Sequence, residues 1–207
     1  TPCGMKVKEL LEKKGYEVVS FHQNGTGGIA MEEMIADGLF NAVLDLTTHE
    51  IVDREFGGLH GAISSNRLEE AGKAGIPQVV VPGCIDYLVF GPVDAIPARF
   101  KNRPFVVHNP ELTLVRASKD EMKHVAGIMA EKLNKAKGEV AIVIPLKGLS
   151  MHNIKGGKFY DPSCDSAMRS ALKNNLRNDI KVYEVEKHIN DSEFAEFVVS
   201  RMLEFNV

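Results

Sequence analysis

The sequence of 207 residues has no tryptophan, only three cysteines and no excess of positive charge. The cysteines stand far apart and form no C-x-x-C pair, which argues against a disulfide framework or a structural zinc site and favours a reducing cytoplasm. Lys and Arg number 25 against 28 Asp and Glu, a net charge of -3, so nucleic acid is not an expected partner. No apolar run approaches the ~18 residues of a membrane span, so no membrane contact is expected.

What is present is a pattern of strands alternating with helices through short connections, with no repeat or long linker. The expected strands are 16–22, "NAVLDLT", "QVVVPG", "RPFVVHNP", "EVAIVIPL" and "DIKVYEVEK". The continuous β-branched run of "QVVVPG" indicates a central strand buried on both faces, whereas "DIKVYEVEK" alternates like an edge strand. About six such strands predict an α/β fold, a Rossmann-like three-layer sandwich with a mostly parallel sheet.

Helix starts carry recognisable capping residues. Ser118 with Glu121, and Thr47 with Glu50, both fit the T/S-x-x-E capping box. Thr1 is a good N-cap for a first helix that would end at Gly15, yet a βα protein normally has a strand before such a helix. We therefore expect residues 1–207 to form a single Rossmann-like subdomain, the second half of a longer two-subdomain protein.

The stretch "FHQNGTGGIAMEEMI" leads from an apolar segment through three glycines into a helix. Gly25, Gly27 and Ala30 match G-x-G-x-x-A, and Asp45 lies 20 residues beyond the first glycine, as in dinucleotide-binding folds. Backbone amides at a helix start attract phosphate, so a phosphate cradle is one interpretation. The other interpretation is a plain strand-to-helix turn without a ligand. Two extra polar residues, Gln23 and Asn24, lengthen the loop before the glycines and disfavour an NAD-binding site. No Walker-type P-loop occurs.

Glu32 and Glu33 follow the glycines within about one helical turn. Acidic residues early in a helix stabilise its dipole, which explains both without a ligand. Alternatively, Glu32 holds a magnesium ion beside the phosphates, directly or through water.

Further polar residues follow other predicted strands and should meet at the same edge of the sheet. They are Asp45, Thr47, Thr48, His49, Glu50, Cys84, Asp86, His108, Asn109, Lys147, Ser150 and His152. Lys147 follows a buried strand and would reach a phosphate, or else is a solvated loop residue. Asp45, His49, Asp86 and His108 could instead gather around a metal or a small acid, with His49 or His108 as the general base of a hydrolase or lyase.

Several ordered motifs resemble one family across nearly the whole chain: "GYEVVSFHQNGTGGIAMEEMI", "AVLDLTTHEIVD", "RLEEAGKAGIPQVVVPGCIDYLVFGP", "VHNPELTLVR" and "GGKFYDPSCD". The sequence is similar to the poorly characterised proteins related to the tomato protein that blocks tobamovirus replication, often described as Tm-one-like ATP-binding domain proteins. The resemblance covers only the second half of that family's usual domain.

This resemblance implies a two-subdomain α/β protein with ATP and magnesium in the cleft between subdomains, and self-association into dimers or larger assemblies. The loop Gly25, Thr26, Gly27 and Gly28 would be the phosphate cradle of this half, with Glu32 and the pair Thr47 and Thr48 as looser candidates. The leading hypothesis is therefore a nucleotide-binding subdomain. A metal-assisted hydrolase or lyase, and a non-catalytic oligomerisation module, remain as alternatives.

Overall fold

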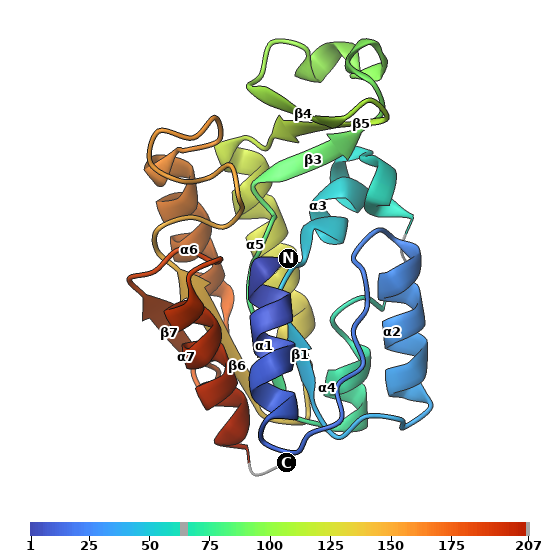
Figure 1. Cartoon of the computed structure of the whole chain (residues 1–207), viewed down its shortest axis with the longest axis vertical. Coiled ribbons are helices and arrows are strands. Elements are labelled where there is room, and N and C mark those ends of the chain that lie inside the picture. Colours follow the sequence, from blue (N-terminus) through green and yellow to red (C-terminus); the bar gives the residue numbers. More distant parts are fainter. Residues whose placement is uncertain (63–65, 206–207) are drawn as a thin grey trace.

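A computed structural model describes residues 1–62 and 66–205 and contains two β-sheets with helices around them (Figure 1). Four parallel strands, in the order β1-β2-β6-β7, form the larger sheet: β1 (Val43–Asp45), β2 (Gln78–Val80), β6 (Val140–Pro145) and β7 (Lys181–Val185). Three antiparallel strands, in the order β3-β5-β4, form the smaller: β3 (Tyr87–Phe90), β4 (Phe105–Asn109) and β5 (Leu112–Arg116).

Seven α-helices and three short 3-10 helices connect the strands within the described residues. The α-helices are α1 (Pro2–Glu12), α2 (Thr26–Ala36), α3 (His49–Phe56), α4 (Glu70–Ala74), α5 (Lys119–Leu133), α6 (Pro162–Asn175) and α7 (Ser192–Leu203). The 3-10 helices are η1 (Leu59–Gly61), η2 (Val93–Ala95) and η3 (Ala98–Phe100). In the part of the chain that the structure describes, every helix is too short or too polar to cross a membrane.

Alternating side chains of the parallel strands divide the core into two layers. Val80 and Ile142 pack on one face with residues of α5 and α6, in the largest hydrophobic cluster. Val79 and Val143 point to the opposite face and pack with α1 and α7, which lie side by side in Figure 1. Since a strand's successive side chains leave opposite faces, this is a three-layer α/β sandwich, as predicted.

Helices α2 and α4 belong to the same layer as α5. Ile35 of α2 and Ala71 of α4 pack on Val43 of β1, and Val43 is paired in register with Gln78. Gln78 shares a sheet face with Val80, which contacts α5. Only α1 and α7 therefore cover the other face among the described α-helices.

The prediction of about six strands in one sheet is wrong in detail, because the parallel sheet has four. Residues 16–22 are extended but form no strand, and they have no backbone ladder to β1 (Figure 1). The segment "RPFVVHNP" does contain β4, but β4 pairs antiparallel with β5. β4 ends at Asn109, and the chain then turns at Pro110 into β5.

Helix caps follow the local sequence where no tertiary contact competes. Ser118 accepts from the Glu121 amide at 3.3 Å while the Glu121 carboxylate accepts from the Ser118 amide at 2.8 Å, so this capping box is confirmed. The second predicted box is wrong: α3 starts after Thr48 with no side-chain cap, because Glu50 is drawn into the buried network described below.

The two boxes give a matched pair of substitutions. Ser118→Ala removes a formed cap and should lower the free energy of unfolding by about 1 kcal/mol. Thr47→Ala removes a hydroxyl that caps nothing and should change it by less than ~0.5 kcal/mol. Urea unfolding followed by far-UV circular dichroism measures both. Equal losses in the two variants would contradict this assignment of the caps.

Candidate functional site

A cavity of about 710 Å³ opens beside β1 and ends at the carboxyl edge of the parallel sheet. Its long walls are α1, residues 16–23 and β1, and are mostly apolar. Polar side chains collect at one end. They are His22, Gln23, Asp45, Thr47 and His49, with Gly28, Cys84 and Tyr87 beside them. Ligands of open α/β sheets bind outside the carboxyl ends of the strands, so this polar end is the candidate site.

A fully buried arginine organises the elements around that end. Arg67 donates from Nε to Glu50 Oε2 at 2.9 Å, from Nη2 to Asp45 Oδ1 at 3.0 Å and from Nη1 to Glu32 Oε1 at 3.3 Å. These three carboxylates come from α3, β1 and α2 and are, like the arginine, 3% exposed or less. A single guanidinium thus fixes the relative positions of three elements that are distant in sequence.

Backbone amides help to balance the remaining negative charge. Glu32 accepts from the Leu68 amide at 2.6 Å and from the Glu70 amide at 3.1 Å. Burial nevertheless raises the pKa of Glu32, with Arg67 acting against that rise. Both Glu32 oxygens are engaged within the protein, so the structure does not bring Glu32 to the cavity as the magnesium ligand that the sequence suggested.

The glycine loop sits directly on this network. Gly25, at the N-cap of α2 with φ of 94°, donates its amide to Glu50 Oε1 at 2.7 Å. Gly27 donates to Asn24 Oδ1 at 3.3 Å, and a Cβ at Gly27 would lie 1.8 Å from the His22 carbonyl oxygen. Two of the loop's amides are therefore already paired, and the glycine at position 27 is required by the turn itself.

Two amides of the same loop remain for a ligand. Within the described residues, the backbone N–H groups of Thr26 and Gly28 have no hydrogen-bond partner. Thr26 is exposed, whereas Gly28 is buried against the Glu50 carboxylate, 2.4 Å from where its Cβ would be. Gly28 also lines the cavity. Of the predicted phosphate cradle, only these two amides in the first turn of α2 remain, and the Glu50 carboxylate lies next to them.

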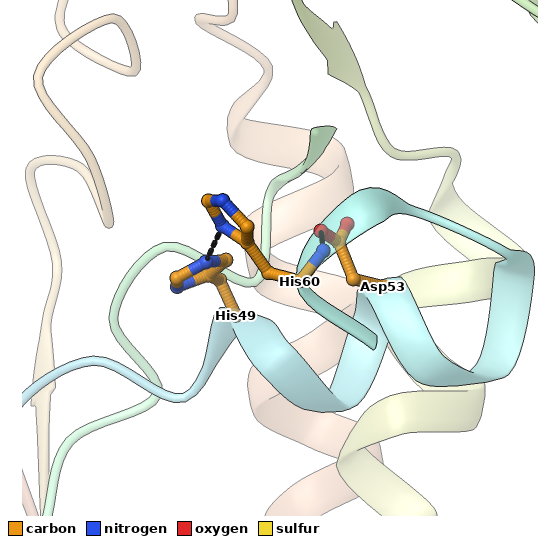
Figure 2. A group of neighbouring side chains, drawn as sticks. All are labelled: His49, Asp53 and His60. Atoms are coloured by element: carbon orange, nitrogen blue, oxygen red, sulfur yellow. Dashed lines mark hydrogen bonds between the residues drawn. The ribbon is translucent and has the colours of Figure 1, made fainter. Parts of the chain in front are cut away.

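Next to this loop, two histidines and an aspartate converge (Figure 2). His49 Nε2 lies 2.8 Å from His60 Nδ1, and one ligand atom from each of His49, Asp53 and His60 falls within 4.8 Å of the others. Asp53 accepts from the amides of Val89 and His60 at 2.9 and 3.0 Å, which leaves a lone pair on each of its oxygens. The His60 carbonyl would be 3.5 Å from a Cβ at Gly25, so this cluster borders the glycine loop.

Burial sets the protonation of the cluster. It lowers the pKa of His49 to about 3, with His60 and Arg67 adding to the effect, and it also lowers the pKa of His60. Burial raises the pKa of Asp53 to about 7 against the opposing effect of its two amide donors. At neutral pH the imidazoles are neutral, and neutral imidazole is the form that binds metals.

Other predicted site residues lie away from this end. Lys147 is exposed at the end of β6 and does not line the cavity. Thr48 is fully buried, with its hydroxyl 3.9 Å from the Met129 sulfur, whereas Thr47 lines the cavity. Of the pair Thr47 and Thr48, only Thr47 is available to a ligand in the cavity.

The four-residue metal group proposed from sequence is not assembled. Asp86 is buried and accepts from the Ser150 hydroxyl at 2.7 Å, in a separate polar cluster with Arg116. His108 is exposed on β4, outside the parallel sheet. Asp45 is held by Arg67 and by Gln23 Nε2 at 2.8 Å. Only His49 of that group takes part in the histidine cluster.

Sequence reasoning missed Arg67, Asp53 and His60. Arg67 stands in "NRLEEAGKAG", which has the composition of an exposed amphipathic turn, so no local signal marks it as buried. His49 and Asp53 are four residues apart, and His60 follows seven residues after Asp53. The four-residue spacing, which places two side chains on one face of a helix, was the one available signal of this cluster.

Comparison with known proteins identifies the family. Residues 1–206 match the C-terminal domain of an uncharacterised protein family, UPF0261. The chain belongs to this family. A UPF0261 protein of Clostridium tetani is 43% identical over 197 residues, which cover 95% of this chain and 48% of that protein. A UPF0261 protein of Rhizobium meliloti is 36% identical over 202 residues, which cover 97% of this chain and 50% of that protein.

A plant protein is among the relatives of this UPF0261 domain. The ToMV resistance protein Tm-1 of Solanum lycopersicum is 40% identical over 210 residues, covering 100% of this chain and 28% of that protein. The chain thus spans about half the length of these bacterial relatives and less of the tomato protein. The resemblance found from the sequence motifs is confirmed.

The buried network yields a stability prediction. Arg67→Met leaves three carboxylates without their shared cation and should lower the free energy of unfolding by about 3–5 kcal/mol. Lys135→Met removes an exposed partner of Glu131 and should cause no measurable change. Urea unfolding at pH 7 measures both, and an Arg67→Met loss below about 1 kcal/mol would mean that the network does not organise this edge.

Proposed function

We propose that this UPF0261 domain binds a nucleotide, ATP with magnesium, at the carboxyl edge of β1. The observation that carries the proposal is the polar end of the 710 Å³ cavity, which Gly28, in the first turn of α2, lines together with Thr47. The exposed Thr26 amide belongs to the same turn of α2. Amides at a helix start favour phosphate oxygens.

The charge around the loop favours a metal-bound nucleotide over a bare phosphate. The buried network next to the loop contains three carboxylates and one guanidinium: Asp45, Glu32 and Glu50 around Arg67. Carboxylates are therefore in excess near the loop amides. An anion there is opposed by Coulomb repulsion unless a cation accompanies it. Magnesium usually binds phosphate oxygens and keeps several waters beside one or two carboxylates. Asp45 is the carboxylate of the buried network that lines the cavity, but Arg67 and Gln23 engage both its oxygens, so it would reach a magnesium ion through water.

A proline at position 26 tests the amide contact. Proline is well tolerated at the first helical position but has no N–H, so Thr26→Pro should preserve α2 and delete one phosphate donor. We expect this variant to bind ATP-magnesium at least about tenfold more weakly than wild type in isothermal titration calorimetry. Thr26→Ala keeps the amide and removes the exposed hydroxyl with its hydrogen bond to Asn24 Oδ1 at 3.1 Å. Because Asn24 Oδ1 still accepts from the Gly27 amide, this variant should bind within about twofold of wild type.

These variants are compared in the longest available polypeptide that contains this domain, after ligand-free melting curves show that they fold equally well. Gly27→Val is unsuitable, because its side chain would meet the His22 carbonyl and distort the loop with or without a ligand. Equal ATP affinity in wild type and Thr26→Pro would refute the proposed cradle. No binding by any of them would instead favour a non-catalytic assembly module.

A second candidate function is metal-assisted hydrolysis at His49, Asp53 and His60, favoured by the convergence of these side chains. Two nitrogen ligands of a tetrahedral zinc ion are roughly 3.3 Å apart, so the pair now 2.8 Å apart would separate by about half an ångström. Both Asp53 oxygens keep a lone pair for the same ion. A metal here would activate water next to the glycine loop, where a phosphate ester would lie.

Zinc binding separates this candidate from a simple hydrogen bond between two imidazoles. Wild-type protein dialysed against zinc and then against buffer should retain about one zinc per chain by atomic emission spectroscopy, and His60→Ala should retain less than a tenth of that. His108→Ala removes an exposed histidine outside the cluster and should retain zinc fully. If His60→Ala holds as much zinc as His108→Ala, the cluster is not a metal centre.

A further inference from the structure

The cavity beside β1 has the position of a missing β-strand. The cavity measures about 710 Å³ and is bounded by β1 on one side and residues 16–23 on the other. Its walls include Val7 and Leu11 of α1 on one face and Met31 of α2 on the opposite face.

Among the described residues, nothing pairs with the edge of β1 that faces the cavity. Val43 donates its amide to Pro77 at 3.0 Å, and Asp45 accepts from the Val81 amide at 2.8 Å, so both bond toward β2. Leu44, which lies between them and lines the cavity, therefore directs its N–H and C=O away from β2. Buried backbone groups are nearly always paired in folded proteins, so this edge calls for a hydrogen-bonding neighbour.

Residues 16–22 already lie where the strand after that neighbour belongs. Tyr16 starts beside the end of α1, through its amide bond to Leu11, and Gln23 reaches Asp45 at the carboxyl end of β1. The segment thus runs in the same direction as β1, as Figure 1 also shows. Tyr16 and Val18 pack toward α1 while Phe21 contacts Phe40, an alternation typical of a strand.

Crossover handedness assigns the empty position independently of the cavity. The connections from β1 to β2, β6 and β7 move across the sheet in one direction, with α4, α5 and α6 on one face. Helix α1 covers the opposite face. Since nearly all βαβ crossovers are right-handed, a strand leading into α1 must lie on the β1 side of residues 16–22. That position is the cavity.

We propose that the cavity is the docking groove for a parallel β-strand supplied by the polypeptide directly ahead of α1, as the longer relatives have room to supply. Helix α1 starts at the correct edge for this, because Thr1 lines the cavity and a Cβ at Gly4 would be 3.9 Å from Leu46. The occupant is an apolar strand, since helices cover both faces of the position. The completed parallel sheet has six strands: 16–22, the docked strand, β1, β2, β6 and β7.

The completed order places a topological switch point between the docked strand and β1. The docked strand would be followed by α1 on one face of the sheet, whereas β1 is followed by α4 on the other face and continues to β2. The polar end of the cavity, with Thr47 and the first turn of α2, lies at that point. The docked strand would then fill the apolar part of the cavity and leave the polar end as the ligand crevice. The strand assignment itself stands without any nucleotide.

Hydrogen–deuterium exchange of the Leu44 amide tests this assignment. In a polypeptide extended by its natural residues ahead of Thr1, Leu44 should exchange at least about 100-fold more slowly than in the chain that starts at Thr1. Ile142, in the interior strand β6, is the control for folding and should be protected in both. Samples contain no nucleotide or metal, so failure here is separate from failure to bind ATP.

Two results would overturn the proposal. One is rapid Leu44 exchange in the extended polypeptide while Ile142 is protected. The other is full Leu44 protection in the chain from Thr1, which would mean that residues 16–22 close directly onto β1. If the shorter chain does not fold, the extended polypeptide alone still decides, by whether Leu44 exchanges within about tenfold of Ile142.

Leu44→Pro provides a second measurement. A proline on an exposed sheet edge is tolerated, whereas one inside a sheet removes a ladder hydrogen bond. The variant should therefore lower the melting temperature of the extended polypeptide by more than about 5 °C and that of the chain from Thr1 by less than about 2 °C. Equal shifts in the two would contradict a strand docked on β1.

Discussion

The geometry of the carboxyl edge depends on one buried guanidinium. Arg67 holds Asp45, Glu50 and Glu32, so the end of β1, the start of α3 and the middle of α2 have fixed positions relative to one another. Glu50 extends the same network to the Gly25 amide. Burying several charges is costly, and replacing all members of such a network together by well-packed hydrophobic residues is often no less stable, unlike removing the arginine alone. We infer that the network is retained for position rather than for stability, because it fixes the shape of the loop that faces the cavity.

That network also limits what the loop can bind. The sequence suggests a cradle of free amides, but Gly25 and Gly27 donate within the protein. A carboxylate behind the helix start cancels part of the positive end of the α2 dipole. Under the proposed function, this arrangement would disfavour a bare anion and favour one that brings its own cation. The histidine cluster borders the same loop.

Local signals in the sequence were sufficient for the elements they specify. The Ser118 capping box and the apolar runs of β2 and β6 depend on neighbours within a few residues, and all are confirmed. Pairing between distant segments was not predictable in this way. Strands β3 and β5 exist because residues about 25 apart meet, and Arg67 is buried because carboxylates from three other elements surround it. The Thr47 box failed for the same reason, since a tertiary ion pair took Glu50 from its local cap.

The strand expected at residues 16–22 is the most informative difference between sequence and structure. Its composition and alternation are those of a strand, and its direction matches β1, yet it forms no ladder with β1, from which the cavity separates it. Strand propensity depends on cross-strand neighbours, so a strand separated from its sheet by one position remains an extended segment. The expectation of six parallel strands and the observation of four are reconciled if one docked strand restores two at once, itself and residues 16–22.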